Sequence, residues 1–269
     1  MSALPVVGFI GLGSQGGPMA ERIVAAGFPL VVWARRREAL APFLEKGADT
    51  ARTIADLGAR CDHVGICVID DAGVVDVCDA LIPAMRPGGR IVIHSTILPE
   101  TCAALADRCA EHGIALIDAP VSGGGQGAAT GTLTVMCGGT PDAFAAAEPV
   151  FATFGKMIVL LGDVGAGQRA KIVNNALMAA NMGLAHAALG AGEALGLDRD
   201  GLSELIKASS GRSFGFEVYA RLPSPAAFAH GAPLLAKDVS LLKSILPDDS
   251  GAEILRATAD PFLQAATGA

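Results

Sequence analysis

Lys171 lies in an apolar stretch with a second polar residue at helical spacing. Asn175 follows four residues later, so both side chains lie on one face of a helix that also carries Met178 and Met182. A lysine in apolar surroundings is costly unless it has a partner or a function, although a lysine at a helix start can extend its ammonium group to solvent. The polar pair favours a general acid or base, because a lysine deprived of water gives up its proton more readily.

A glycine-rich motif near the N-terminus has the spacing of a dinucleotide-binding loop. Gly11-Leu12-Gly13-Ser14-Gln15-Gly16 follows a predicted strand, residues 6–10, and precedes a predicted helix. In such a loop the first glycine allows a tight turn, the second lets the backbone approach a pyrophosphate, and the third packs the helix on the strand. A plain strand-to-helix turn would also explain the glycines, but their place in a βαβ unit favours a dinucleotide.

The end of the next predicted strand, residues 30–33, indicates which dinucleotide fits. An NAD site carries an acid here that binds the ribose 2′-hydroxyl, whereas this chain has Ala34, then Arg35 and Arg36, and no acid before Glu38. Guanidinium groups bind a phosphate through paired hydrogen bonds. Arginines at a helix start can also be merely solvated, yet this combination favours the 2′-phosphate of NADP over NAD.

Two further segments follow predicted strands, at the sheet edge where open α/β sheets bind ligands. Ser95 and Thr96 end one segment, and Ser122, Gly123 and Gly124 lie in the other. The backbone amides and hydroxyl of the second segment can hold a carboxylate. Taken alone, each segment also has a structural explanation, as a helix cap before Pro99 or as a chain turn.

Strands and helices alternate over the first 160 residues or so, which predicts an α/β fold. We expect a Rossmann-type, doubly wound and mostly parallel sheet, with an antiparallel addition at residues 132–137. Strand signals are absent after residue 168. We therefore predict an NADP-binding domain at residues 1–164 and an all-α substrate and dimerisation domain at residues 165–269, opened by a long helix. The strands are expected at residues 6–10, 30–33, 63–69, 90–94, 114–118, 132–137 and 157–161, and helices at 18–26, 36–46, 99–112 and 141–154.

Composition excludes several classes of protein. The net charge of −7 argues against nucleic-acid binding. The most apolar stretch, residues 172–195, contains three asparagines, a histidine and a glutamate, so it predicts a buried helix rather than a membrane span. The N-terminus has no basic, apolar leader pattern, and a cytoplasmic protein is expected. The six cysteines form no CxxC pair, which predicts reduced thiols and no metal site.

Together these motifs resemble the β-hydroxyacid dehydrogenases, the family of 3-hydroxyisobutyrate dehydrogenase and tartronate semialdehyde reductases. The resemblance spans nearly the whole chain, and its four separated motifs occur in the family's order. It departs from the family at His94, where an acid or amide is usual, and this change is expected to alter the nicotinamide pocket. The matching residues are 8–13, 18–20, 95–96, 99–101, 118–124, 131–134, Gly165, Gly167, Lys171, Asn174, Asn175, Lys237 and Asp238.

The resemblance implies a role for each matching site residue. Lys171 would donate and accept the proton, and Thr96 would lie near the nicotinamide. Val68 and Ile69 would line the adenosine side, and Lys237 would lie over the cofactor. Four residues would hold the carboxylate and hydroxyl of the substrate: Ser122, Gly123, Gly124 and Asn175.

The predicted function is hydride transfer between NADP(H) and a small 3-hydroxy acid or its semialdehyde. The family also implies a homodimer or homotetramer formed by the helical domain, and small residues along its first helix, such as Gly183, would permit close helix packing. An imine reductase shares this architecture but has a different residue at position 171. A non-catalytic NADP-binding scaffold is the other alternative, against which the combination of Lys171, Asn175 and Ser122 counts.

Overall fold

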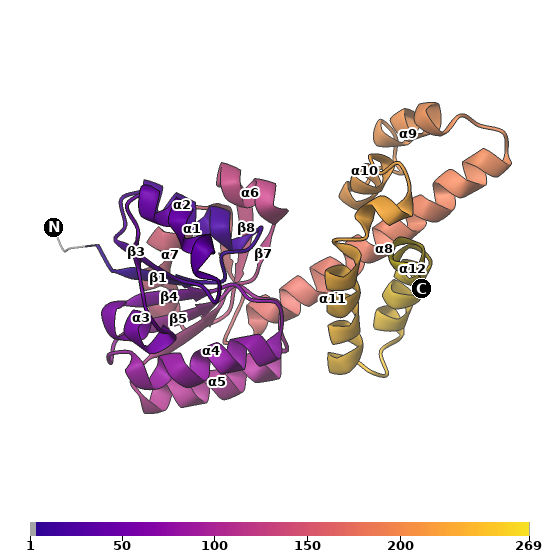
Figure 1. Ribbon diagram of the computed structural model, residues 1–269. Helices are drawn as coiled ribbons and strands as arrows, with labels where there is room; N and C mark the ends of the chain where they lie inside the picture. Colours follow the sequence, from indigo (N-terminus) through magenta and orange to yellow (C-terminus); the bar gives the residue numbers. More distant parts are fainter. Residues whose placement is uncertain (1–3, 269) are drawn as a thin grey trace. The chain divides into compact units, whose positions relative to one another are not determined.

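Six short, largely apolar segments form a parallel sheet in the order β3-β2-β1-β4-β5-β6 (Figure 1). Residues of β1 pair with β2 on one side and with β4 on the other, so Val7 lies opposite both Leu30 and His63. The strands follow one another in opposite senses on the two sides of the β1–β4 pair, although all of them run parallel, and in open sheets the crevice at such a switch point binds ligands. The strands are β1 (Val7–Ile10), β2 (Leu30–Trp33), β3 (Asp49–Thr50), β4 (His63–Ile66), β5 (Arg90–Ile93) and β6 (Ala115–Asp118).

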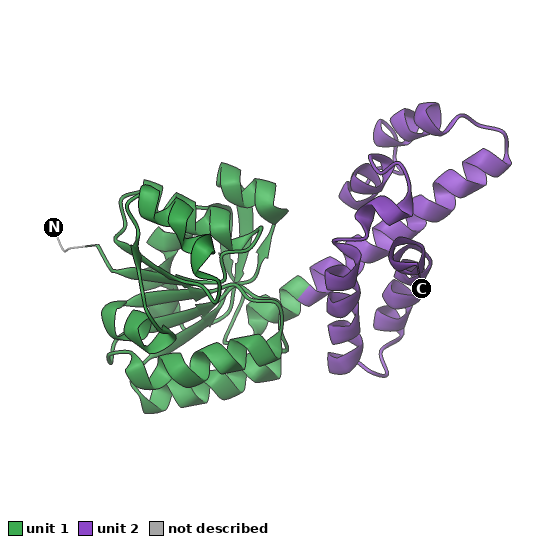
Figure 2. Ribbon diagram, viewed as in Figure 1, with its two compact units in different colours: residues 1–171 green, residues 172–269 purple. Residues whose placement is uncertain are grey.

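This computed structural model describes residues 4–268 and divides into two units, Met1–Lys171 and Ile172–Ala269 (Figure 2). Unit 1 is the α/β part and unit 2 is helical. The predicted fold class, a Rossmann-type domain followed by an all-α domain opened by a long helix, is confirmed. Within residues 4–268, no helix is long and apolar enough to cross a membrane.

Helices cover both faces of the parallel sheet (Figure 1). One face packs against residues such as Met19, Phe43 and Phe151, and the other against Leu57 and Val77. The first group comes from α1 (Gly16–Ala25), α2 (Ala41–Glu45), which follows the 3₁₀ turn η1 (Arg37–Leu40), and α7 (Pro141–Phe151). The second group comes from α3 (Ile54–Arg60), α4 (Asp71–Leu81), which continues into η2 (Ile82–Ala84), and α5 (Pro99–Glu111).

A second, three-stranded sheet completes unit 1. In it β8 (Leu133–Cys137) runs antiparallel to β7 (Val121–Ser122) and parallel to β9 (Gly155–Leu160), and α6 (Gly124–Thr130) connects β7 to β8. The antiparallel addition at residues 132–137 is thus present, but in a separate sheet. Pro120 explains the break after β6, because proline has no N–H for a ladder; its carbonyl accepts a hydrogen bond from Met136 N instead.

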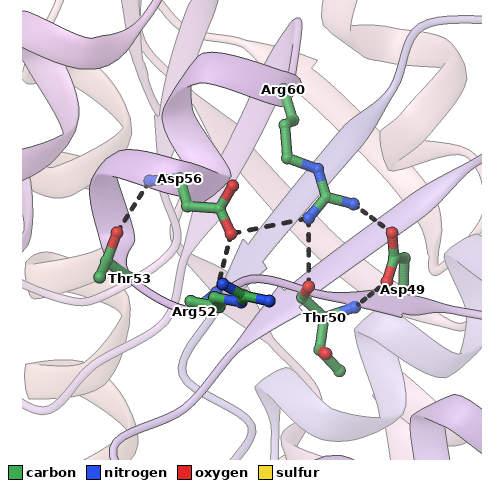
Figure 3. A network of polar contacts seen from close by, with 6 residues as sticks. All are labelled: Asp49, Thr50, Arg52, Thr53, Asp56 and Arg60. Carbon is green, nitrogen blue, oxygen red and sulfur yellow. Dashed lines mark hydrogen bonds and ion pairs between the residues drawn. The ribbon is translucent and has the colours of Figure 1, made fainter.

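The two-residue strand β3 forms one edge of the large sheet, and charged side chains cover it (Figure 3). Arg60 donates to the Thr50 carbonyl at 3.1 Å and forms an ion pair with Asp49. Asp56 accepts from Arg52 N at 2.8 Å and lies 3.7 Å from Arg60 Nη1. A short, charged edge with an occupied carbonyl is a poor template for pairing with another chain.

All six cysteines are free thiols. Five are buried, and Cys67 is half-buried. Burial raises the pKa of the Cys61, Cys67, Cys78 and Cys137 thiols to about 12 and that of Cys109 to about 11. Burial also raises the pKa of Cys102, next to Asp118.

Unit 2 is built from helices packed around Tyr219 and Phe262. The long helix α8 (Ala166–Ala194) begins in unit 1, and at Gly183 a side chain would collide with the Thr258 carbonyl. Gly183, one of the small residues expected to permit close helix packing, therefore allows α8 to contact residue 258 of the same chain. The remaining elements are α9 (Arg199–Lys207), α10 (Phe214–Ala220), η3 (Pro225–Phe228), α11 (Ala232–Ile245) and α12 (Ser250–Thr267).

Candidate active site

The glycine loop between β1 and α1 is tightly packed at its two ends and open in the middle. Gly11 has φ +99°, and a side chain there would collide with the Cys67 carbonyl at the end of β4. A side chain at Gly16, the first residue of α1, would collide with the Gly11 carbonyl. Gly13 faces open space, with no atom within 4 Å of where a Cβ would lie. The loop therefore leaves room for a phosphate group beside its backbone.

Three residues follow β2 at the same edge of the sheet. Ala34 is half-buried and packs against the core, whereas Arg35 and Arg36 are exposed. Exposed guanidinium groups at this place can meet a phosphate without first being released from a buried ion pair. The arrangement is chemically suited to a 2′-phosphate.

The ends of β4 and β5 are joined by a side-chain hydrogen bond. Val68 N donates to Ser95 Oγ at 2.8 Å, and Ser95 is buried. Thr96 is half-buried beside it, whereas Ile69 is 66% exposed. The segments carrying Val68 and Thr96 are thus in direct contact at the carboxyl edge of the sheet.

Asp118, the last residue of β6, anchors the start of α8. Its carboxylate is fully buried and accepts from Gly165 N at 2.6 Å through Oδ1 and from Gln168 N at 2.8 Å through Oδ2. Burial raises the pKa of Asp118, while these two amides act in the opposite direction. A side chain at Gly167 would collide with the Met136 carbonyl. Glycine is therefore needed where α8 starts against β8.

Gln168 links the same helix start to β5. Its side chain is fully buried, with Nε2 donating to Ser95 O at 2.8 Å and Oε1 accepting from Ile97 N at 3.1 Å. Lys171 follows three residues later in α8 and is 9% exposed. Gln168 and Asp118 have no local sequence signal for these roles, because their partners are distant in the sequence.

The segment Ser122–Gly124 lies beside the glycine loop. Gly123 and Gly124 have φ values of +128° and +64°, and a Cβ at the next residue, Gly125, would lie 2.5 Å from Ser14 O. Ser122 is half-buried and both glycines are exposed. The loop expected to hold a carboxylate therefore borders the loop expected to hold the cofactor.

His94 belongs to the core rather than to the surface of this edge. Its ring stacks on Phe9 at 5.9 Å and meets Phe151 and Phe154 edge-on. Nδ1 lies 2.8 Å from Ala119 O, and a carbonyl only accepts, so Nδ1 carries the hydrogen. Burial lowers the pKa of His94 to about 4. Any effect of this residue on a nicotinamide pocket would be indirect.

Unit 2 brings together the other two predicted site residues. Asn175 Nδ2 donates to Asp238 Oδ2 at 2.6 Å, and Lys237 Nζ lies 3.2 Å from Asp238 Oδ1. Asp238 is buried in α11 and thus joins the amide to the ammonium group. Asp238 belongs to a family motif that implied no role for it, and its only sequence signal is that it is an acid within an apolar helix. Lys171 and Asn175 are one turn apart on α8.

Two family models together match nearly the whole chain. Residues 6–162 match the NAD binding domain of 6-phosphogluconate dehydrogenase, and residues 165–267 match the NAD-binding domain of NADP-dependent 3-hydroxyisobutyrate dehydrogenase. The NAD-dependent L-serine dehydrogenase of Pseudomonas aeruginosa is 37% identical over 254 residues, covering 87% of this chain and 83% of that protein. The chain belongs to the β-hydroxyacid dehydrogenase family.

Solved structures similar to this β-hydroxyacid dehydrogenase agree with it in fold over nearly its whole length. The 3-hydroxyisobutyrate dehydrogenase of Mycobacterium tuberculosis with L-serine has a TM-score of 0.86 and 27% identity, covering 97% of this chain and 93% of that one. Psf3 in complex with NADP⁺ and 2-OPP has a TM-score of 0.84 and 27% identity, covering 97% of this chain and 99% of that one. The predicted family and enzyme class are confirmed: this β-hydroxyacid dehydrogenase is an NAD(P)-dependent dehydrogenase acting on CH–OH groups.

Proposed function

We propose that the protein transfers hydride between NADP(H) and a small 3-hydroxy acid or its semialdehyde, with Lys171 as general acid and base. One observation carries the proposal: an unbroken set of contacts at the carboxyl edge of the sheet. Gly11 packs on Cys67, Val68 bonds to Ser95, Ser95 bonds to Gln168, and Gly125 packs on Ser14. The contacts join the glycine loop, the Thr96 segment, the Ser122 segment and the helix of Lys171.

The residues of unit 1 fit a bound dinucleotide. The open backbone at Gly13 would receive the pyrophosphate, and Val68 and Ile69 would line the adenosine. Relatives are named for NAD in one case and bound to NADP⁺ in another, so the choice of NADP rests on Ala34, Arg35 and Arg36. The family resemblance further assigns Lys237 to the cofactor. When bound, the nicotinamide supplies the hydride acceptor for oxidation and the donor for reduction.

The substrate class follows from the polar groups available. The amides of Gly123 and Gly124 and the Ser122 hydroxyl would hold a carboxylate, and the Asn175 amide would hold the hydroxyl. Asp238 accepts from one side of that amide, which fixes its orientation. One relative is named a serine dehydrogenase and another a 3-hydroxyisobutyrate dehydrogenase, and both names denote a carboxylate with a hydroxyl on the third carbon.

Lys171 would manage the proton at the reacting oxygen. In oxidation the unprotonated amine accepts the hydroxyl proton as the carbon becomes a carbonyl. In reduction the ammonium group returns a proton to that oxygen. Its buried place on α8 removes competing water, and the hydrogen bonds of Asp118 fix the start of that helix.

Replacing Lys171 by Met tests the proposal, because methionine keeps most of the packing volume and loses the proton donor. Turnover should fall by about 10²–10⁴-fold. NADPH affinity should hold, and the melting temperature should hold or rise, because a buried cation has been removed. Turnover should be scored on a panel of 3-hydroxy acids, semialdehydes and imines with NADPH and NADH.

Lys156→Met is the matched control, because Lys156 is exposed in β9. Its turnover should equal that of the unmodified protein. Full turnover in well-folded Lys171→Met would remove the catalytic assignment and return the non-catalytic scaffold to consideration.

A further inference from the structure

Gln168 is a fully buried polar side chain that the proton-transfer chemistry does not use. Its amide makes two hydrogen bonds to one short segment, to Ser95 O at 2.8 Å and from Ile97 N at 3.1 Å. These two groups belong to the peptide bonds on either side of Thr96. A single side chain therefore holds the backbone of Thr96 from both ends.

Gln168 is itself held in place. Its backbone N–H donates to Asp118 Oδ2 at 2.8 Å. An amide that is anchored at the backbone and engaged at both ends has one orientation, and removing it leaves buried donors and acceptors without partners. All these partners lie in unit 1.

We propose that Gln168 is a positioning residue that sets Thr96 against the first turn of the helix carrying Lys171. Since Lys171 follows three residues later in the same helix, this hydrogen-bonded bridge fixes the spacing between the nicotinamide side of the site and the proton-transfer group. The inference rests on the proposed function. A shift of about 1 Å between reacting groups can cost about 100-fold in rate, so the bridge should act on turnover more than on binding.

Two substitutions test this role. Gln168→Leu removes both hydrogen bonds, and kcat should fall by about 10- to 100-fold with a much smaller change in KM for the hydroxy acid. In the cofactor-free protein, backbone amides 95–98 should exchange with deuterium faster than in the unmodified protein. Gln264→Leu, the same change at an exposed position of α12, should alter neither.

Gln168→Glu separates positioning from mere stabilisation. A protonated glutamic acid can donate to Ser95 O and accept from Ile97 N, whereas an ionised one repels the Ser95 carbonyl. The kcat of this variant, divided by that of the unmodified protein at each pH, should therefore rise as pH falls. The charged and titratable groups around Gln168 are Asp118 and Cys102, with Arg169 and Asp71 close to them. The division cancels the pH dependence that the two proteins share.

Unchanged kcat and unchanged amide exchange in Gln168→Leu would overturn the inference. So would a loss in both variants that follows the melting temperature and shows no recovery at low pH. If Gln168→Leu does not fold, Gln168→Glu at low pH still decides the question. Failure of the proposed function is separate, because it appears as full turnover in Lys171→Met while amide exchange at residues 95–98 still reports on Gln168.

Discussion

Arg35 and Arg36 are the residues on which the preference for NADP over NAD depends. Both are exposed after β2, beside an alanine in the position of the acid that NAD sites use. Losing a charged hydrogen-bond partner costs about 1.5–3 kcal/mol, or roughly 10- to 100-fold in affinity. Arg35→Ala combined with Arg36→Ala should weaken NADPH binding by at least this factor and NADH binding little, as measured by calorimetry.

Arg86→Ala provides the control for that pair. Arg86 is exposed and precedes β5, so it lies at the opposite end of the parallel strands from Arg35 and Arg36, and it forms an ion pair with Asp62 at 3.5 Å. The affinity for both cofactors should be unchanged in this variant. Tighter binding of NADH than NADPH by the unmodified protein would contradict the NADP assignment.

His94 makes the free energy of unfolding depend on pH. Burial lowers its pKa from 6.5 to about 4, so between these values the unfolded chain binds more protons than the folded one. The contribution of His94 to the free energy of unfolding is therefore fully present above pH 6.5. It is lost as the pH falls toward 4, which lowers the free energy of unfolding by up to about 3 kcal/mol. His63, also buried with a lowered pKa, acts in the same direction.

Denaturant titrations of His94→Asn across this pH range test the effect. Asparagine keeps a donor for the Ala119 carbonyl but does not titrate, so stability should fall less steeply with decreasing pH, by up to about 1.4 kcal/mol per pH unit. His112→Asn, at an exposed position, should retain the steeper dependence. Equal slopes in all three proteins would refute the role of His94.

At the scale of elements, the start of α8 depends on a glycine. A side chain at Gly167 would meet the Met136 carbonyl and both the carboxylate and carbonyl of Asp118. Gly167→Ala should therefore destabilise the protein by about 1–3 kcal/mol or more, because backbone atoms cannot move aside easily. Gly190→Ala lies in the same helix with open space around it and should stabilise by about 0.5–1 kcal/mol. Equal stabilities in urea would disprove the close contact.

The elements that the sequence predicted are those with a long apolar signal. Residues 30–33 match β2 in full, and the long helix from residue 166 follows the loss of strand signals. The strands β3 and β7 have two residues each and show no periodicity, and α6 is glycine-rich, so these elements were missed. Short segments take their conformation from neighbours rather than from their own residues.

Site residues likewise fall into those that a local sequence motif reveals and those that depend on partners distant in the sequence. Gly11 and Gly16 follow from a local motif, and the structure shows the crowding that requires glycine there. The partners Asp118 and Gln168 are 50 residues apart, and Asn175 and Asp238 are 63 apart. Such hydrogen bonds depend on folding of the whole unit, so no local pattern reveals them. The catalytic role of Lys171 stays a prediction.

At the scale of the whole molecule, unit 2 exposes large apolar side chains on α8. Leu177 is 51% exposed and Leu184 is 57% exposed, seven residues apart and thus on one face of the helix. Exposed apolar faces of this kind mark association surfaces. We predict a homodimer or larger assembly through unit 2, with a corresponding mass by light scattering at micromolar concentration.

Leu177→Lys combined with Leu184→Lys should convert the assembly to monomers without changing helix content, because charges on this face would oppose its burial. Leu44→Lys, an equally exposed leucine on α2 of unit 1, is the matched control and should leave the mass unchanged. A monomeric mass for the unmodified protein would refute the predicted association.

The buried or half-buried native cysteines make selective labelling of an introduced cysteine practicable. Thiol reagents attack the thiolate, and burial keeps the native thiols protonated at neutral pH. A cysteine introduced on the exposed surface would therefore take up a fluorophore or spin label selectively, with the native residues left in place. With one label in each unit, Förster energy transfer or pulsed electron paramagnetic resonance would measure the distance between the two units as cofactor and substrate are added.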